Sequence, residues 1–96
     1  MTNFTYKPLP NGLVIGISEI EGQGLFSTRT FADHTTLGVS HHIVNYQIVR
    51  TPLGGFVNHS DDPNCELVEN GDTYILRTIK MILPGTELTV RYSLEQ

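Results

Sequence analysis

Turn-forming residues divide this chain into short runs, and this constrains the fold more than any other feature. Pro10-Asn11-Gly12, Asn70-Gly71 and Pro84-Gly85 are turn signals. The runs between them are apolar or alternate between apolar and polar residues, as β-strands do, and helical periodicity is hard to find. The expected strands are residues 13–18, 36–40, 43–49, 87–92 and the two runs that flank Asn70-Gly71. Turns at about every eight to twelve residues predict a mainly β fold, a compact sandwich or barrel.

Length and charge limit the domain organisation and the partners. A chain of 96 residues is long enough for one core, so we expect one domain over residues 1–96. Only six Lys and Arg and a net charge of −4 argue against nucleic acid as a partner, but are compatible with a basic protein or peptide. The N-terminus does not resemble a signal peptide and no apolar run reaches membrane-spanning length, so we expect a cytoplasmic protein that binds no membrane.

The stretch from residue 54 to residue 66, GGFVNHSDDPNCE, packs an unusual density of polar groups behind Phe56 and Val57. It is either a capped polar turn or a site where an Asn side chain and backbone amides receive a polar ligand. A metal site is a weaker alternative, because the candidate ligands lack a recurring spacing. Those ligands are His59, Asp61, Asp62 and Cys65, with His41 and His42 as further candidates. Cys65 is the only cysteine, which excludes an intramolecular disulfide and a multi-cysteine zinc site, and we expect no metal.

Two further motifs are each ambiguous alone. Gly22 and Gly24, one residue apart, indicate a β-turn or a backbone that a ligand approaches closely. They are not a dinucleotide fingerprint, because no third glycine and no helix follow them. Tyr92, at the end of the last expected strand, is by itself more typical of a structural aromatic residue.

Taken together and in this order, the three motifs resemble the SET-domain lysine methyltransferases. The family pattern is Gly-x-Gly with an apolar pair, then Asn-His-x-x-x-Pro-Asn, then Glu-Leu-x-x-x-Tyr. The matching stretches are Gly22 to Phe26, Asn58 to Asn64 and Glu87 to Tyr92. The sequence is most similar to the compact bacterial and viral members, which lack the zinc-binding regions that flank the SET domain in other members. Its single cysteine agrees with this, because it cannot form a zinc cluster.

The resemblance implies a SET-domain fold, mainly β, in which small β-sheets surround a threaded, pseudoknot-like C-terminal crossing. It also implies S-adenosyl-L-methionine as the cofactor and Tyr92 as the catalytic residue. The residues that it assigns to cofactor binding are Gly22, Gln23, Gly24, Leu25, Asn58, His59 and Tyr92. The chain lacks the Tyr-x-Gly element of larger members, so His41, Tyr46 and Tyr74 are the candidates for the substrate channel.

The implied activity is methyl transfer to a lysine side chain of a protein substrate, in a bacterial cell or a virus-infected host cell. The alternative is a catalytically degenerate SET-like module that only binds protein. Only four residues follow Tyr92 in this sequence, so the lysine channel would lack one wall. We therefore expect a homodimer to complete it.

Overall fold

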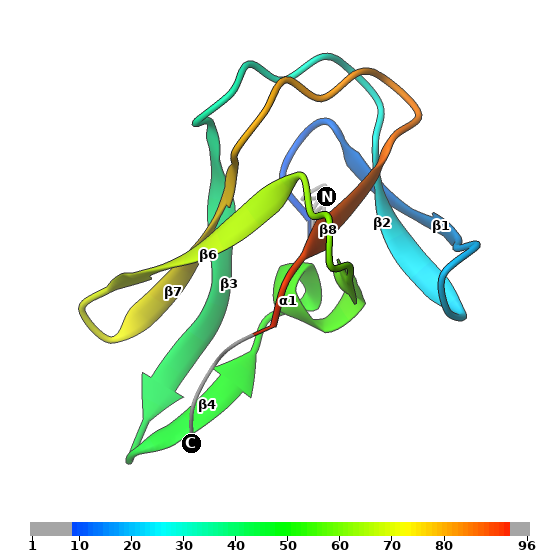
Figure 1. Ribbon diagram of the computed structural model, residues 1–96. Helices are drawn as coiled ribbons and strands as arrows, with labels where there is room; N and C mark the ends of the chain where they lie inside the picture. The colour runs from blue at the N-terminus through cyan, green and yellow to red at the C-terminus, as the bar shows by residue number, and fades with distance from the viewer. Residues whose placement is uncertain (1–8, 93–96) are drawn as a thin grey trace, which may run out of the picture.

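The computed structural model describes residues 9–92, which form strands and one short helix (Figure 1). The elements are β1 (Leu13–Ile17), β2 (Gln23–Ser27), β3 (Thr36–Val44), β4 (Gln47–Arg50), α1 (Pro52–Phe56), β5 (Asn58–His59), β6 (Cys65–Asn70), β7 (Thr73–Thr78) and β8 (Glu87–Val90). The predicted mainly β fold is confirmed. The last strand is shorter than predicted, since it ends at Val90.

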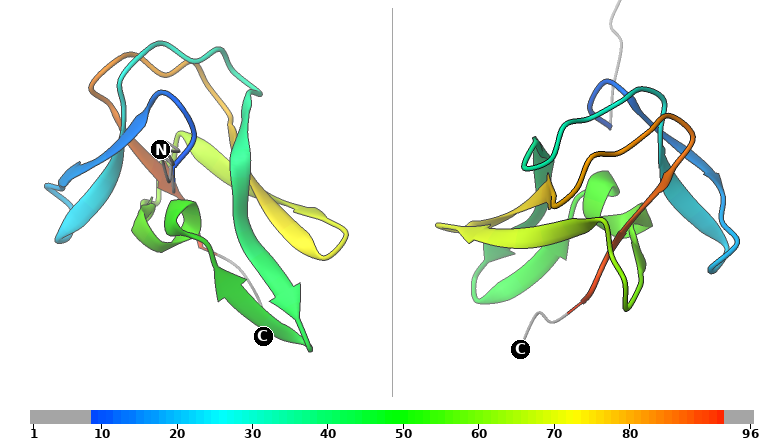
Figure 2. Two further views of the ribbon diagram at one scale, coloured as in Figure 1. Left: turned by 180° about the vertical axis from the view of Figure 1, so that it is seen from behind. Right: turned by 45° about the horizontal axis from the view of Figure 1, so that its top comes forward.

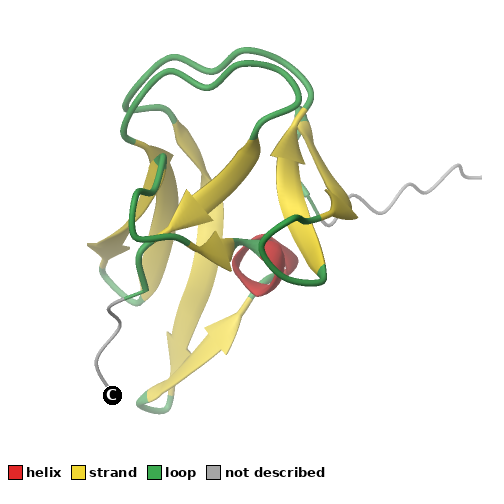
Figure 3. Ribbon diagram, turned by 45° about the vertical axis from the view of Figure 1, so that its right-hand side comes forward, coloured by secondary structure: helices red, strands yellow, loops and turns green. Residues whose placement is uncertain are grey.

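The strands form two sheets, with the orders β1-β2-β8-β5 and β4-β3-β7-β6 (Figure 2). Two long loops, residues 28–35 and 79–86, run side by side over one end of the molecule and connect the sheets (Figure 3). Phe31 and Ile82 form an antiparallel bridge between these loops. The buried core consists of Leu13, Leu25, Phe31, Leu37, Leu53, Val57, Cys65, Leu76, Ile82, Leu88 and Val90.

The C-terminal strand β8 completes the first sheet by entering between β2 and β5. It pairs antiparallel with β2, where Leu25 lies opposite Leu88. It pairs parallel with β5, where Asn58 lies opposite Thr89. This parallel pairing places the Asn-His segment beside the C-terminal strand and brings the second and third motifs together.

The predicted single strand over residues 43–49 is wrong, because a two-residue turn interrupts it. Asn45 and Tyr46 have positive φ angles of 51° and 66°. Val44 pairs with Gln47, so these residues form a tight hairpin loop between β3 and β4. Two successive residues with positive φ are the signature of a type I′ turn, whose twist matches that of the flanking strands. Tyrosine is not a usual residue there, which is why the sequence did not reveal the turn.

The hairpin predicted at Asn70-Gly71 is confirmed, with its loop one residue further along the chain. Asn70 pairs with Thr73, so the two loop residues are Gly71 and Asp72. Gly71 has a φ of 62°, a conformation that glycine adopts without steric cost.

Helix α1 was not predicted, because its five residues include two glycines and show no helical period. Thr51 caps it, and Pro52 stands at the start, where a missing N–H costs nothing. Leu53 and Val57 bury the helix against the core. The sequence Thr-Pro was the only local signal for this element.

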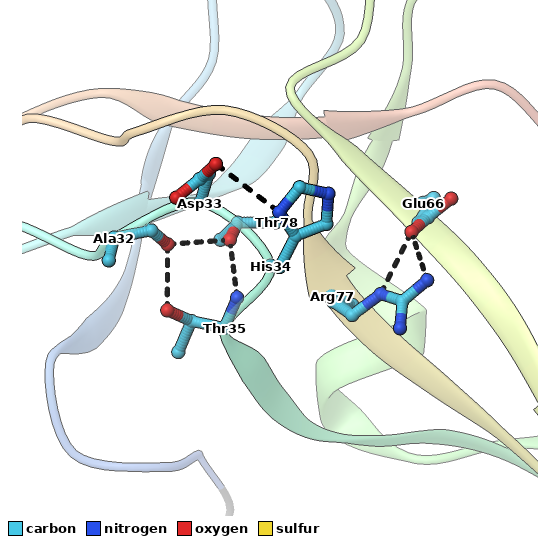
Figure 4. A network of polar contacts seen from close by, with 7 residues as sticks. All are labelled: Ala32, Asp33, His34, Thr35, Glu66, Arg77 and Thr78. Atoms are coloured by element: carbon cyan, nitrogen blue, oxygen red, sulfur yellow. Dashed lines mark hydrogen bonds and ion pairs between the residues drawn. The ribbon is translucent and has the colours of Figure 1, made fainter.

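Strand β7 is tied to its surroundings by polar contacts (Figure 4). The buried Thr78 hydroxyl donates to the carbonyl of Ala32 at 2.8 Å and accepts the N–H of Thr35 at 2.8 Å. Arg77 donates to the carboxylate of Glu66, its partner on β6, with Nε at 2.8 Å and Nη2 at 2.6 Å. The Thr78 contacts hold the loop of residues 28–35 against the second sheet, and the Arg77–Glu66 pair joins β7 to β6.

Candidate active site

A cavity of about 460 Å³ lies where the three motifs meet. It is lined by Glu21, Gly22, Gln23, Arg50, Gly55, Phe56, Val57, Asn58, His59 and Tyr92. The lining therefore comes from the β1–β2 loop, the end of β4, helix α1, β5 and the residues that follow β8. Segments far apart in the sequence build one site.

The β1–β2 loop is closed by Ser18. The Ser18 hydroxyl accepts the backbone N–H groups of Ile20 and Glu21, at 2.9 Å and 3.2 Å. The Ser18 N–H donates to the carbonyl of Gly22 at 2.9 Å. Gly22 has a φ of 51° and open space where a Cβ would lie, so the loop presents bare backbone to the cavity.

Glu87, the first residue of β8, connects this loop to the Asn-His segment. Its carboxylate accepts the Ser18 hydroxyl at 2.8 Å and the Asn58 amide at 2.9 Å. A Cβ on Gly24 would lie 2.2 Å from the same carboxylate. A side chain at position 24 would therefore displace the Glu87 carboxylate from Ser18 and Asn58.

The Asn58 side chain holds the β1–β2 loop in place. Its amide nitrogen is within hydrogen-bonding distance of Ser18 Oγ, Glu87 Oε2 and the carbonyls of Glu21 and Gln23, at 2.9 to 3.2 Å. An amide has two hydrogens, so the four oxygens share them. Asn58 thereby fixes the cavity wall that Gly22 and Gln23 form.

A second asparagine, Asn64, ties the crossing itself. Its side-chain oxygen accepts the N–H of Thr89 at 2.9 Å, and its amide donates to the carbonyl of Glu87 at 2.9 Å. Both partners are backbone groups of β8, so Asn64 adds side-chain hydrogen bonds to β8 where its pairing with β5 begins. Within the polar stretch of residues 54–66, Asn58 therefore holds the cavity wall and Asn64 holds strand β8.

Replacing the two asparagines separately should distinguish these roles. Asn58→Ala should cost only about 1 kcal/mol of stability, because two of its acceptors are exposed carbonyls that water can satisfy. Asn64→Ala should cost about 2 kcal/mol, since it leaves backbone groups of a central strand unpaired. Urea unfolding measures both, and equal losses would contradict this division of roles.

His59 fixes the chain after β8. Its Nδ1 accepts the backbone N–H of Tyr92 at 3.0 Å, so its proton is on Nε2, which donates to Asp61 at 3.1 Å. The rings of His59 and Tyr92 are nearly parallel, at an angle of 17° with centroids 6.2 Å apart. The position of the Tyr92 backbone is therefore set by the second motif.

The Tyr92 hydroxyl is held by helix α1. It donates to the carbonyl of Val57 at 2.9 Å and lies 3.2 Å from the carbonyl of Gly54. Burial raises the pKa of Tyr92 above its ordinary value, although the nearby Arg50 acts in the opposite direction. The phenol is therefore protonated at neutral pH, and its oxygen retains lone pairs that can accept a hydrogen bond.

The structure brings most of the predicted cofactor residues together and leaves others elsewhere. Gly22, Gln23, Asn58, His59 and Tyr92 line the cavity. Leu25 is fully buried in the core. Residues not predicted to bind the cofactor also line the cavity: Glu21, Arg50, Gly55, Phe56 and Val57. Glu21 precedes Gly22 and residues 55–57 precede Asn58, whereas no motif marks Arg50.

None of the three channel candidates is among the residues that line the cavity. Tyr46 is fully exposed in the turn between β3 and β4. His41 is buried on β3, where its Nδ1 is 2.8 Å from the Ser40 hydroxyl. Tyr74 on β7 makes an edge contact with His41, with ring centroids 6.1 Å apart. Buried His41 and half-buried Tyr74 thus form one aromatic pair between neighbouring strands.

The burial of His41 predicts a pH dependence of stability. Burial, with a contribution from Arg50, lowers the pKa of His41 below its ordinary value of 6.5. The unfolded chain therefore binds this proton at a higher pH than the folded chain, so stability falls as the pH drops below about 6.5 and levels off below the folded pKa.

Urea unfolding of the parent and of His41→Asn tests this between about pH 7 and about pH 5. The variant should lose less stability over that range. The two slopes should agree near pH 8, where the histidine is neutral in both states. Parallel curves throughout would contradict the argument.

The metal alternative has little structural support. Within residues 9–92, no group of three or more His, Cys, Asp or Glu side chains is arranged to hold a metal ion. Cys65 faces the core at 1% exposure, and burial raises the pKa of its thiol to about 12. A thiol that resists deprotonation is a poor metal ligand.

The described chain also contains no helix with the length and apolar character of a membrane span.

The family profile described as the SET domain matches residues 41–93, more than half of the chain. The protein is a member of the SET domain family. The match includes the second and third motifs, whereas Gly22 and Gly24 precede it.

Similar proteins agree with this SET membership. Histone-lysine N-methyltransferase SMYD3 of Mus musculus is 46% identical over 41 residues, 43% of this chain and 10% of that protein. Histone-lysine N-methyltransferase Suv4-20 of Caenorhabditis elegans is 38% identical over 42 residues, 44% of this chain and 15% of that protein. The SET chain therefore spans only a small part of the length of these relatives.

Solved structures show the same fold. A candidate histone methyltransferase of Plasmodium falciparum superposes with a TM-score of 0.74 at 18% identity, covering 88% of this chain and 95% of that one. The methyltransferase domain of human PR domain-containing protein 2 gives a TM-score of 0.71 at 18% identity, covering 92% and 81%. The predicted SET fold is confirmed.

Proposed function

We propose that this protein is an S-adenosyl-L-methionine-dependent methyltransferase that modifies a lysine side chain of a protein substrate, as a single SET domain over residues 1–96. The observation that carries the proposal is the Tyr92 hydroxyl, anchored to main-chain carbonyls in the wall of a cavity that Gly22 and Asn58 also line.

The cavity suits the cofactor in size and charge. Its volume of about 460 Å³ is typical of small-molecule sites. Arg50 and Glu21 supply one positive and one negative side chain, which complement the carboxylate and the ammonium of an amino acid. Gly22 leaves open space where another residue would place a Cβ. The residues that would hold the cofactor are Gly22, Gln23, Asn58, His59 and Arg50.

When bound, S-adenosyl-L-methionine supplies a methyl group on a positive sulfonium. The accepting lysine must be neutral, although a free lysine has a pKa of about 10.4. The apolar surfaces of Phe56 and Val57 in the cavity wall favour the neutral amine by desolvation. Water can then carry the proton away, so the chain needs no strong base of its own.

Tyr92 would orient the amine. Its proton is donated to carbonyls of α1, so its oxygen can accept an N–H of the lysine. That hydrogen bond would direct the nitrogen lone pair towards the methyl group. Alignment of this kind contributes more than acid-base catalysis in a transfer of this type.

Isothermal titration with S-adenosyl-L-methionine and its demethylated product tests cofactor binding. We expect binding by the parent and weaker binding by Asn58→Ala, with Asn64→Ala as the matched control because its contacts lie on β8. Incubation of lysates with labelled cofactor then tests transfer to protein. Absence of heat at millimolar cofactor would favour the degenerate binding module instead.

We also propose a homodimer in the cytoplasm. β1 is an edge strand, and its side of the molecule exposes Ile17 at 88% and Ile20 at 52%. Exposed apolar side chains on an unpaired edge are suited to association with a second copy. Sedimentation at micromolar concentration tests the dimer, with Ile17→Lys as the variant expected to be a monomer. A parent that also sediments as a monomer would reject the proposal.

A further inference from the structure

Helix α1 is fastened to strand β3 through Thr51. The Thr51 hydroxyl donates to the carbonyl of Val39 at 2.7 Å and is 3.0 Å from the carbonyl of Ser40. The Thr51 N–H also donates to the carbonyl of Ser40 at 2.9 Å. Thr51 thus binds two consecutive carbonyls of a central strand.

On its other side, Thr51 holds the helix. Its hydroxyl oxygen accepts the N–H of Gly54 at 3.3 Å, and its carbonyl accepts the N–H of Gly55 at 2.8 Å. The same hydroxyl therefore donates to the strand and accepts from the helix. It is the side-chain connection between the two elements at the start of α1.

The Tyr92 hydroxyl contacts helix α1 at residues that follow this Thr51 connection. The two carbonyls that receive the phenol belong to Gly54, inside the helix, and to Val57, its C-terminal cap residue. A rotation of α1 would move both acceptors together. The position of the Tyr92 hydroxyl thus depends on how the helix is set against β3.

Apolar packing by itself does not fix that rotation. Leu53 and Val57, 2% and 4% exposed, hold α1 against the core, but hydrophobic burial is non-directional. Within residues 9–92, the hydrogen bonds that connect β3 to the start of the helix are those of the Thr51 hydroxyl and N–H. Thr51 is not part of the described cavity lining, so its effect on the site must pass through the helix.

We propose that Thr51 is a positioning residue for Tyr92: its hydroxyl sets the rotation of α1 and thereby places the two carbonyls that hold the phenol. The consequence for catalysis rests on the proposed function. The placement of Tyr92 does not, and it can be measured in the absence of any substrate.

The test replaces Thr51 by Val, which keeps the shape and removes the hydroxyl, and by Ser, which keeps the hydroxyl and removes the methyl group. The protein is labelled with 3-fluorotyrosine, whose phenol titrates at lower pH than tyrosine, and is observed by ¹⁹F NMR. The Tyr92 signal is assigned by its loss in Tyr92→Phe. Tyr46, fully exposed in its turn, is the internal reference.

We expect the pKa of residue 92 to move towards its ordinary value in Thr51→Val and to stay as in the parent in Thr51→Ser. Where transfer is measurable, kcat should fall about tenfold in Thr51→Val with little change in KM, and Ser should restore it. A Tyr92 signal in Thr51→Val that titrates as in the parent would overturn the proposal. So would equal changes in Val and Ser, because the hydroxyl would then not be the cause.

If Thr51→Val does not fold, Thr51→Gly takes its place, because glycine is the mildest replacement for a lost helix cap. The Tyr92 titration in Thr51→Gly and in Thr51→Ser is then compared with that of the parent in the same way. Absence of methyl transfer in every variant, the parent included, would count against the proposed function and would leave the NMR test of Thr51 intact.

Discussion

Replacing Tyr92 by Phe should lower the rate of methyl transfer about 10²-fold while the protein keeps its fold. The ring would still lie beside His59, with which it stacks. The lost hydroxyl would leave the carbonyls of Gly54 and Val57 without this donor, at a cost of about 1 kcal/mol. The incoming amine would lose the acceptor that orients it.

The measurement is single-turnover transfer to a protein substrate found in the labelling screen, together with a urea unfolding curve. Tyr46→Phe is the matched control, because Tyr46 is fully exposed and does not line the cavity. Turnover of Tyr92→Phe within a few-fold of the parent would reject Tyr92 as the catalytic tyrosine.

Replacing Gly54 by Ala should destabilise the protein by about 3 kcal/mol, the upper end of the usual cost of overpacking. An added Cβ would lie 2.2 Å from the carbonyl oxygen of Ser40 and 2.9 Å from Cε1 of His41. The Ser40 carbonyl cannot yield easily, because it accepts the N–H of Thr51. The helix would have to leave β3 and take the acceptors of Tyr92 with it.

The neighbouring glycine provides the control. A Cβ on Gly55 would meet nothing within 4 Å, and its φ is not positive. Gly55→Ala should therefore stabilise the helix by roughly 0.5–1 kcal/mol, through the lower entropy of the unfolded chain. The midpoints of urea denaturation compare the stabilities of the two variants, provided that their m-values are equal. Equal midpoints for both would contradict the close packing of α1 on β3.

The sequence predicted elements whose signals are local. Asn70-Gly71 specified a hairpin because the turn conformation depends on the residues within it. Helix α1 escaped prediction because five residues carry no period, and its stability comes from burial of Leu53 and Val57 by the rest of the chain. The turn at Asn45 and Tyr46 was missed because its conformation is imposed by the flanking strands and not by the residues of the turn itself.

The same distinction applies to the site. Asn58, His59 and Tyr92 stood in recognisable motifs and meet at one cavity. Arg50 reaches that cavity from the end of β4, which only the three-dimensional arrangement reveals. The role of Glu87 as the shared acceptor of Ser18 and Asn58 likewise depends on contacts between residues far apart in sequence.

The insertion of β8 between β2 and β5 has a consequence for the order of folding. Sheet β4-β3-β7-β6 can pair as soon as residue 78 has been made, but the other sheet remains split until the last strand arrives. Pairings of such long range are slow to form, because the closure of a long loop precedes any gain from contacts. Gly22, Asn58 and Tyr92 therefore come together only in the final docking step. A nascent chain would therefore lack the proposed cofactor site until β8 and Tyr92 have left the ribosome.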